Sequence, residues 1–273
     1  MGARVLITGT SRGIGRAIGE ELFARGYEII ATARRPESLS QTAYHTRLQL
    51  DVTDDASVAR ATTEAGPIDI LINNAGVGAG GPTEHVPIEE VIRQFDTNFF
   101  GAARMIKAVL PQMRSRHAGT IVNLSSLSSR VPWPFGGYYA ASKAALEALS
   151  EALRLEVASF GIRVILVEPG IVDTEFGERF SSYGAASSDY KDLSSAWATQ
   201  FESSHEGPRA VAVAIANALE EERFPLRVVV GEDAIKLLSM RREFDDVEFD
   251  EHFRQHFGLP APNWRSGDAT LLP

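Results

Sequence analysis

Hydrophobic residues along this chain gather into seven short apolar runs, each separated from the next by a longer segment. The runs are rich in Val, Ile and Leu, are bounded by turn residues, and lie at residues 4–8, 28–33, 47–52, 67–72, 120–124, 161–167 and 226–230. Such runs are typical of buried strands. Helical patterns follow them, ending near residues 25 and 65 and covering 88–116, the region from 139 onward, 208–222 and 233–242. The alternation predicts a single doubly wound α/β domain over residues 1–273, with a seven-stranded parallel sheet and helices on both faces.

Two segments lack this regular pattern. Residues 176–206 are rich in Ser, Gly, Ala, Tyr and Trp, and we expect a loop or short helices that close over a substrate as a lid. Four aromatic residues would make that lid apolar, unless they are scattered packing residues: Phe176, Phe180, Tyr183 and Trp197. Residues 243–273 form an acidic, aromatic tail. Its histidines lack the spacing of a metal site, so we expect packing against the body or a partner subunit.

The first strand leads directly into a glycine-rich turn, Thr8-Gly9-x-x-x-Gly13-x-Gly15, which opens a helix. Glycines let the backbone turn tightly and approach a pyrophosphate, and the exposed amides at the start of the helix attract its charge. The turn therefore predicts a dinucleotide site near the amino terminus. A glycine-rich turn without a ligand is the alternative.

Arginines follow the second strand. In dinucleotide folds the residue at this strand end meets the adenosine ribose, where a carboxylate selects a free 2′-hydroxyl and an arginine accommodates a 2′-phosphate. The chain offers Arg34 and Arg35 and no carboxylate, and Arg12 precedes the second glycine of the turn. We expect NADP(H), with NAD(H) as the alternative. Each arginine could also be simply solvated.

A tyrosine and a lysine four residues apart begin the helix that follows the fifth strand. This spacing puts Tyr139 and Lys143 on one face. A phenol titrates near 10, and a neighbouring cation stabilises its phenolate. Ser126, at the end of the preceding strand, could hydrogen-bond a substrate oxygen. The plain alternative is a packed ring and a solvated ammonium.

Together with the glycine turn, Ser126, Tyr139 and Lys143 resemble the serine, tyrosine and lysine of the short-chain dehydrogenase/reductase family, in its compact type. The resemblance covers nearly all of residues 3–232 and implies a Rossmann-like fold. The segments Val-Pro-Trp-Pro-Phe-Gly-Gly-Tyr (131–138) and Leu-Arg-Leu-Glu (153–156) resemble the branch with hydroxysteroid and retinol dehydrogenases. That branch implies a carbonyl reductase or alcohol dehydrogenase activity on a hydrophobic ketone, aldehyde or alcohol, with Tyr139 as the proton donor.

The resemblance also implies roles for residues at the other strand ends. Asp51 and Val52 would hold the adenine, and the element Asn-Asn-Ala-Gly (73–76) would support the nicotinamide-side ribose. Asn98 would hold a relay water through its main chain, or its side chain bonds only locally. The expected cofactor-binding set is Gly9, Ser11, Arg12, Gly13, Ile14, Gly15, Arg34, Arg35, Asp51, Val52, Asn74, Ala75, Gly76, Tyr139, Lys143, Pro169, Gly170, Val172 and Thr174. The expected catalytic set is Asn98, Ser126, Tyr139 and Lys143.

Composition excludes several other classes of protein. A hydrophobic content of 44% with 23% charged residues is ordinary for a globular protein. The net charge of −9 argues against a nucleic-acid or anionic-membrane partner. The absence of cysteine excludes disulfides and thiolate metal sites, and we expect no metal. The chain shows neither a long apolar leader nor a run of eighteen apolar residues, so we expect a soluble, cytoplasmic protein.

Two alternatives to an NADP(H)-dependent reductase stay open at this stage. One is an NAD-preferring alcohol dehydrogenase of the same fold. The other is a nucleotide-sensing regulatory protein with incidental activity, although such proteins often lose the tyrosine or the lysine that this chain keeps. The resemblance further implies a homodimer or homotetramer, formed through the helices that begin near Ile88 and Tyr139.

Overall fold

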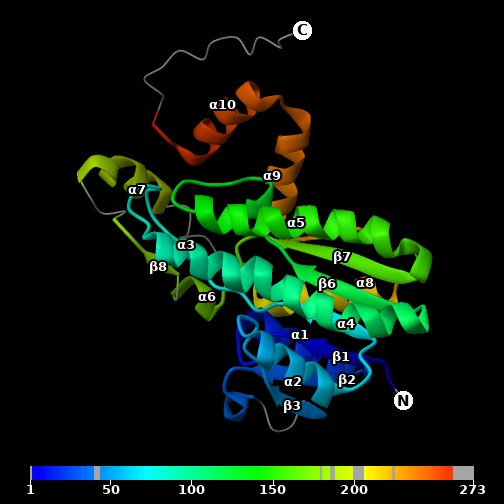
Figure 1. The fold of residues 1–273 in the computed structure, drawn as a ribbon. Coiled ribbons are helices and arrows are strands. Elements are labelled where there is room, and N and C mark those ends of the chain that lie inside the picture. Colours follow the sequence, from blue (N-terminus) through cyan, green and yellow to red (C-terminus); the bar gives the residue numbers. More distant parts are fainter. Residues whose placement is uncertain are drawn as a thin grey trace.

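A parallel sheet of seven strands forms the centre of the molecule (Figure 1). The computed structural model describes residues 2–39, 44–178, 180–184, 188–198, 206–222 and 225–260. The strand order is β3-β2-β1-β4-β6-β7-β9, and every adjacent pair is parallel. The strands are β1 (Arg4–Ile7), β2 (Glu28–Ala33), β3 (Thr46–Gln49), β4 (Ile70–Asn73), β6 (Gly119–Leu124), β7 (Ile162–Pro169) and β9 (Arg227–Val230). The predicted fold class is confirmed.

Helices cover both faces of this sheet. Helices α1 (Gly13–Ala24) and α8 (Pro208–Glu220) pack on one face, and α2 (Asp55–Ala65), α4 (Ala102–Arg116) and α5 (Gly137–Val157) on the other. The remaining helices are α3 (Ile88–Phe95), α6 (Glu175–Glu178), α7 (Lys191–Ala198), α9 (Glu232–Glu243) and α10 (Asp246–Phe257). Short 3₁₀ turns lie at Pro36–Ser38, Leu127–Ser129, Ala158–Phe160 and Ser188–Tyr190.

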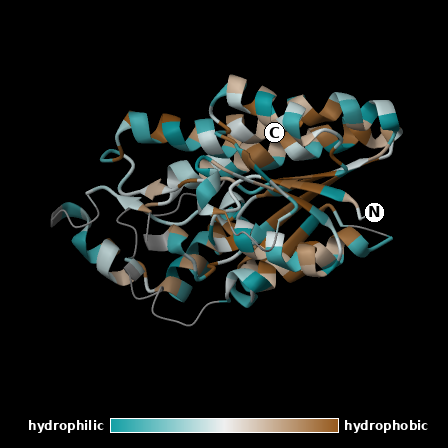
Figure 2. Ribbon diagram, turned by 90° about the horizontal axis from the view of Figure 1, so that it is seen from below, coloured by the Kyte–Doolittle hydropathy of each residue, from teal (hydrophilic) through white to brown (hydrophobic). Residues whose placement is uncertain are grey.

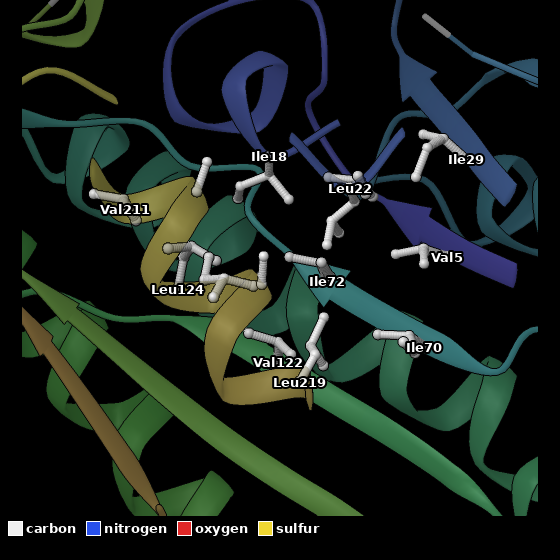
Figure 3. Close-up of a cluster of buried hydrophobic side chains, with 14 of the residues drawn as sticks. Val5, Ile18, Leu22, Ile29, Ile70, Ile72, Val122, Leu124, Val211 and Leu219 are labelled. Atoms are coloured by element: carbon white, nitrogen blue, oxygen red, sulfur yellow. The ribbon is translucent and has the colours of Figure 1, made fainter. Parts of the chain in front are cut away.

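The two hydrophobic cores follow from the alternation of side chains along each strand. In β1, Val5 and Ile7 face α1 and α8, whereas Leu6 faces the opposite core. Because both faces are covered, the central strands are rich in apolar residues, which Figure 2 shows as brown strands between partly teal helices, whereas the edge strand β3 has Leu48 as its one apolar residue. In Figure 3, Ile18 and Leu22 of α1 and Val211 and Leu219 of α8 meet side chains from β1, β2, β4 and β6.

The helix predicted over residues 88–116 contains a π-helical segment. Residues Asp96–Gly101 form this segment between α3 and α4. The extra residue of a π turn shifts the helical phase, and such bulges are frequent at functional sites. Asn98 lies inside it and is fully buried, which explains an amide in mid-helix. Sequence periodicity could not separate this turn from the flanking α-helix.

The sheet has a topological switch point between β1 and β4. From β1 the chain winds outward through β2 to the edge strand β3, then returns to β4 on the other side of β1. The loops after β1 and β4 therefore leave the same edge of the sheet in opposite directions. In open α/β sheets such a point opens a crevice at the carboxyl ends of the strands.

Two structured regions were not predicted as such. A separate two-stranded sheet pairs β5 (Ala79–Gly80) with β8 (Ser181–Ser182), and strands of two residues leave no periodic signal. The tail forms α10, whose capping box of Asp245 and Glu248 was a usable sequence signal. Phe253 of α10 is buried against Leu237 and Leu238 of α9 and other apolar residues, so the tail packs on the body as expected. Residues 261–273 of the tail lie outside the described residues, as do 179, 185–187 and 199–205 of the expected lid.

Candidate active site

The glycine turn between β1 and α1 adopts the backbone conformations that only glycine takes readily. Gly9 has a φ of +73° and Gly13 a φ of +53°. A Cβ atom at Gly15 would lie 2.4 Å from the Gly9 carbonyl oxygen and 2.3 Å from the Asn74 amide nitrogen. The turn is thus packed directly against the loop that follows β4.

Asn74 and Thr8 join these two loops across the switch point. The Asn74 amide nitrogen donates hydrogen bonds to the carbonyl oxygens of Thr8 (2.8 Å) and Gly9 (3.0 Å). In return, the Thr8 hydroxyl oxygen accepts from the backbone N–H groups of Asn74 (3.0 Å) and Ala75 (2.9 Å). The side-chain amide of Asn74 therefore bridges the two loops, and the glycine turn is held in place.

A cavity of about 940 Å³ runs along the carboxyl ends of the strands from this turn. One end is lined by Arg34, Asp51 and Thr53, and the other by Trp133, Phe135 and Trp197. Apart from Arg35, every residue of the expected cofactor-binding set lines it, and so does Ser126. The sequence positions that were assigned to one dinucleotide thus converge on one continuous space, although they come from the ends of five strands and from helix α5.

The arginines of the expected phosphate site lie in different environments. Arg12 and Arg34 line the cavity. Arg35 is exposed and starts a 3₁₀ turn, where its carbonyl oxygen accepts from the backbone N–H (3.0 Å) and hydroxyl (2.6 Å) of Ser38. Its side chain does not line the cavity, because successive residues of an extended segment point to opposite sides.

At the end of the cavity lined by Arg34, two aspartates of the loop after β3 have distinct partners. The carboxylate of Asp51 accepts from the N–H (3.0 Å) and hydroxyl (2.7 Å) of Thr53, which fixes the loop at the cavity. Asp54 caps α2 by accepting from the N–H of Ala56 at 2.9 Å.

Ser126, Tyr139 and Lys143 lie together along the cavity. Burial raises the pKa of Tyr139 to about 12, and a hydrogen bond with Ser126 opposes this rise. Burial lowers the pKa of Lys143 to about 8, and the nearby carboxylate of Glu147 opposes this fall. Both groups therefore hold their protons at neutral pH. The ammonium nitrogen lies 5.9 Å from the centre of the Tyr139 ring and donates to the Leu124 carbonyl oxygen at 2.7 Å.

Asn98 lies behind the cavity rather than along it. Its amide oxygen accepts from the N–H of Val77 and its amide nitrogen donates to the carbonyl of Val77, both at 2.9 Å. The same nitrogen donates to the Ser142 hydroxyl at 2.9 Å. The Asn98 side chain thus makes the local hydrogen bonds that were the alternative to a relay role. The relay water on its main chain stays a prediction.

Aromatic side chains cover the reacting end. The ring centres of Phe176 and Phe180 lie 5.8 and 6.2 Å from that of Tyr139. Of the four expected lid aromatics, Phe176, Phe180 and Trp197 line the cavity and Tyr183 does not. Tyr183 instead uses its backbone N–H to bond the carbonyl of Gly80 at 2.9 Å, so it ties the lid to the loop after β4.

Three residues near the site escaped the sequence analysis. Asp233 accepts from the N–H of Ile171 at 2.8 Å and so holds the turn that follows β7. Ser125 lines the cavity next to Ser126, and its hydroxyl donates to the buried carboxylate of Glu147 at 2.6 Å. Glu147 had one sequence signal, namely its position four residues after Lys143 on the same helical face.

Comparison with known proteins agrees with this geometry. The family model described as short chain dehydrogenase matches residues 3–183. The chain belongs to the short-chain dehydrogenase family. This short-chain dehydrogenase is 39% identical over 237 residues to a 3-ketodihydrosphingosine reductase of Bacteroides thetaiotaomicron, covering 83% of this chain and 87% of the relative. It is 39% identical over 249 residues to retinol dehydrogenase 8 of Homo sapiens, covering 82% and 79%.

Solved structures give the same result for the fold. A short-chain dehydrogenase from Streptomyces avermitilis matches with a TM-score of 0.80 and 34% identity, covering 94% of this chain and 99% of that one. A short-chain dehydrogenase from Burkholderia cenocepacia in complex with NADP matches with a TM-score of 0.78 and 28% identity, covering 95% and 98%. Within the residues that the structure describes, no helix is long and apolar enough to cross a membrane. The protein is thus an oxidoreductase of a family whose fold binds nicotinamide cofactors.

Proposed function

We propose that this short-chain dehydrogenase uses NADP(H) to interconvert a hydrophobic ketone or aldehyde with its alcohol, and that residues 1–273 form one catalytic domain with a lid over 176–206. The observation that carries the proposal is the cavity itself. It joins the glycine turn and Arg34 at one end to Ser126, Tyr139 and Lys143 at the other. A dinucleotide bound along this cavity would have its phosphates at the backbone amides of the turn and its nicotinamide beside the proton donor.

The residues along the cavity fit a dinucleotide at each point. The backbone amides after Gly13 start α1 and face the pyrophosphate position, where the helix dipole favours negative charge. Arg12 and Arg34 supply two cations where NADP carries its 2′-phosphate, with no carboxylate beside them on the end of β2. The Burkholderia cenocepacia relative is solved with NADP and other matching structures with NADH or NAD, so the proposed preference rests on the two arginines.

In the proposed reaction the bound cofactor supplies the hydride for the carbonyl carbon. Tyr139 donates its phenolic proton to the oxygen as negative charge develops there. Ser126 holds that oxygen, and the ammonium of Lys143 stabilises the tyrosinate that forms and binds the ribose hydroxyls. We expect Asn98 to hold a water through its main chain that returns a proton toward Lys143.

The apolar side chains at the reacting end support a hydrophobic substrate. Phe176 and Phe180 pack against Tyr139, and Trp133 and Trp197 line the space beyond. The relatives named for 3-ketodihydrosphingosine and retinol agree with this class, although their substrates are properties of those proteins.

We also propose a homodimer or homotetramer formed through α3 and α5 and the π segment. Ile88, Ile92, Phe100 and Leu155 expose between 51% and 81% of their surface there. Light scattering after size exclusion would test this, and a monomer at micromolar concentration would contradict it.

The test of the proposed activity is the loss of reduced-nicotinamide absorbance, with NADPH and NADH in parallel, against carbonyls from small aldehydes to steroid-sized ketones. We expect NADPH-dependent turnover that favours the larger, apolar members. Faster turnover with NADH would favour an NAD-preferring dehydrogenase instead. No turnover on any carbonyl, with NADPH still raising the melting temperature, would favour a nucleotide-sensing protein.

A further inference from the structure

A buried carboxylate lies one helical turn beyond Lys143 on α5. Glu147 is 5% exposed, and each of its carboxylate oxygens has separate partners. Oε1 accepts hydrogen bonds from the hydroxyls of Ser125 (2.6 Å) and Ser129. Oε2 lies 3.0 Å from a guanidinium nitrogen of Arg227, which comes from β9. One carboxylate therefore connects helix α5 to the end of β6 on one side and to the edge strand on the other.

The two serines bound by Glu147 flank Ser126 on both sides. Ser125 precedes it directly, and the Ser129 hydroxyl also contacts the carbonyl oxygen of Ser126 at 2.6 Å. Ser126 itself has an extended backbone, and its hydroxyl oxygen accepts from the N–H of Ser128 at 3.2 Å. The backbone before and after Ser126 is thus fixed to the same carboxylate oxygen, so the place of its hydroxyl in the cavity depends on Glu147.

The charged groups around Glu147 form a compact cluster. Arg227 also pairs with Glu151 of α5 and lies 2.5 Å from the fully buried Glu168 of β7. Arg130, after the Leu127–Ser129 turn, lies 3.6 Å from Glu168. Burial raises the pKa of Glu168, and the neighbouring Glu147 raises it further. With Lys143, the cluster contains three cationic and three acidic side chains, and Lys143 is the cation that lines the cavity beside Tyr139.

We propose that Glu147 is a positioning residue for the reaction: its carboxylate holds the Ser126 hydroxyl in place through Ser125 and Ser129, and its charge stabilises the ammonium of Lys143. This inference rests on the proposed function. Lys143 and Glu147 are four residues apart on one helical face, where opposite charges attract. Neither role requires Glu147 to touch the substrate.

The charge role has a defined consequence for the titration of Lys143. Burial already lowers the pKa of this lysine to about 8, and the carboxylate of Glu147 opposes that fall. Removing the carboxylate charge lowers the pKa further, so less ammonium remains beside Tyr139 at pH 7 to 8. Glutamine keeps the shape but has only one acceptor oxygen, so it removes the charge together with one of the two sets of hydrogen bonds.

The test compares Glu147→Gln with Glu151→Gln. Glu151 is the matched control because it lies one turn further along α5 and pairs with the same guanidinium, but it is half exposed and binds no serine. In Glu147→Gln we expect kcat at pH 7.5 to fall on the order of 10- to 100-fold, as for a misplaced reacting group. The alkaline limb of the reduction profile should move down by about half a pH unit or more. Glu151→Gln should keep kcat within about twofold of wild type and leave the alkaline limb in place.

A second variant separates positioning from charge. Ser129→Ala removes one link between Glu147 and the Ser126 backbone and leaves the carboxylate in place. We expect kcat to fall several-fold with the alkaline limb unmoved. If Glu147→Gln fails to fold, Ser129→Ala still tests the positioning role of Glu147. Unchanged kcat in Ser129→Ala would then overturn that role.

A readout independent of turnover keeps the inference apart from the proposed function. The chain has four lysines, Lys107, Lys143, Lys191 and Lys236, so ¹³C labelling of lysine gives few resonances to assign. The Lys143 resonance should titrate at lower pH in Glu147→Gln than in wild type and Glu151→Gln. Equal titration in all three, or equal kcat and equal pH profiles, would overturn the inference. An inactive wild type in which Lys143 still responds to Glu147→Gln would instead count against the proposed function.

Discussion

The amide nitrogen of Asn98 donates a hydrogen bond to the hydroxyl of Ser142 at 2.9 Å. Ser142 lies between Tyr139 and Lys143 on α5 and donates in turn to the carbonyl of Tyr139 at 2.7 Å. The π segment is thereby attached to the helix that carries the proton donor. Because the same amide also pairs with both backbone groups of Val77, one side chain joins three segments of the site.

We expect Asn98→Ala to destabilise the fold by about 2 kcal/mol, because the half-buried N–H and carbonyl of Val77 and the buried hydroxyl of Ser142 lose their partner. Urea unfolding would measure this change. Asn217→Ala is the control, since Asn217 is exposed on α8 and alanine is the better helix former. Equal stability of the two variants would show that the Val77 groups find other partners.

Tyr139→Phe should reduce kcat on the order of 10²- to 10⁴-fold, the usual contribution of a general acid. NADPH affinity, measured by fluorescence titration, should change little because the ring remains. Tyr138→Phe is the neighbouring control, since its exposed hydroxyl donates to the Thr83 carbonyl at 3.4 Å and Tyr138 does not line the cavity. Most activity surviving in Tyr139→Phe would remove the tyrosine from the proposed mechanism.

Arg34→Asp should shift the preference from NADPH toward NADH, because a carboxylate repels a 2′-phosphate and accepts hydrogen bonds from a free ribose. The measure is the ratio of kcat/KM for the two cofactors. Arg35→Asp carries the same charge change one residue further along, where the side chain does not line the cavity, and should leave the ratio nearly unchanged. An equal shift of this ratio in both variants would mean that long-range charge, rather than contact with the 2′-phosphate, sets the cofactor preference.

Lys143→Met should change how stability depends on pH. Burial lowers the pKa of Lys143 to about 8, so the folded protein holds this proton less well than the unfolded chain, where lysine titrates near 10.5. The resulting destabilisation is fully present below pH 8 and is relieved as the pH rises to 10.5. Wild type should therefore gain stability relative to Lys143→Met across that window in denaturant titrations.

The control for this pH dependence is Lys236→Met, because Lys236 is exposed on α9. Its stability difference from wild type, measured over the same pH range, is the reference for that of Lys143→Met. The same pH dependence in both variants would mean that Lys143 titrates normally in the folded protein.

Gly80→Ala should impair the closure of the lid. A Cβ atom there would lie 2.3 Å from the Phe135 carbonyl oxygen and 2.5 Å from the Phe180 ring. Overpacking against backbone costs about 1–3 kcal/mol, so we expect kcat/KM for a large ketone to fall roughly tenfold. Gly137→Ala, which meets nothing within 4 Å, should leave kcat/KM unchanged. Equal kcat/KM for the two variants would show that the β5–β8 pairing does not contribute to substrate binding.

The prediction of the fold succeeded because its signals are local. Val5, Leu6 and Ile7 are buried on both faces of the sheet, so an uninterrupted apolar run marks the strand without any knowledge of its neighbours. The π segment, β5 and β8 were missed because their formation depends on contacts with distant residues, whereas α10 was missed although its capping box is a local signal. Ala79 of β5, for instance, pairs with Ser181 of β8, more than a hundred residues later.

For the site, the order of residues alone identified the glycine turn and Ser126 at strand ends. It also placed Tyr139 and Lys143 one helical turn apart. Those spacings are set by the covalent chain and by helical geometry. The packed structure was needed to establish that Arg34 rather than Arg35 lines the cavity. It was also needed to show that Glu147 binds the serines beside Ser126. Which side an extended residue faces, and which carboxylate is buried with a partner from another strand, depend on how the sheet and helices pack.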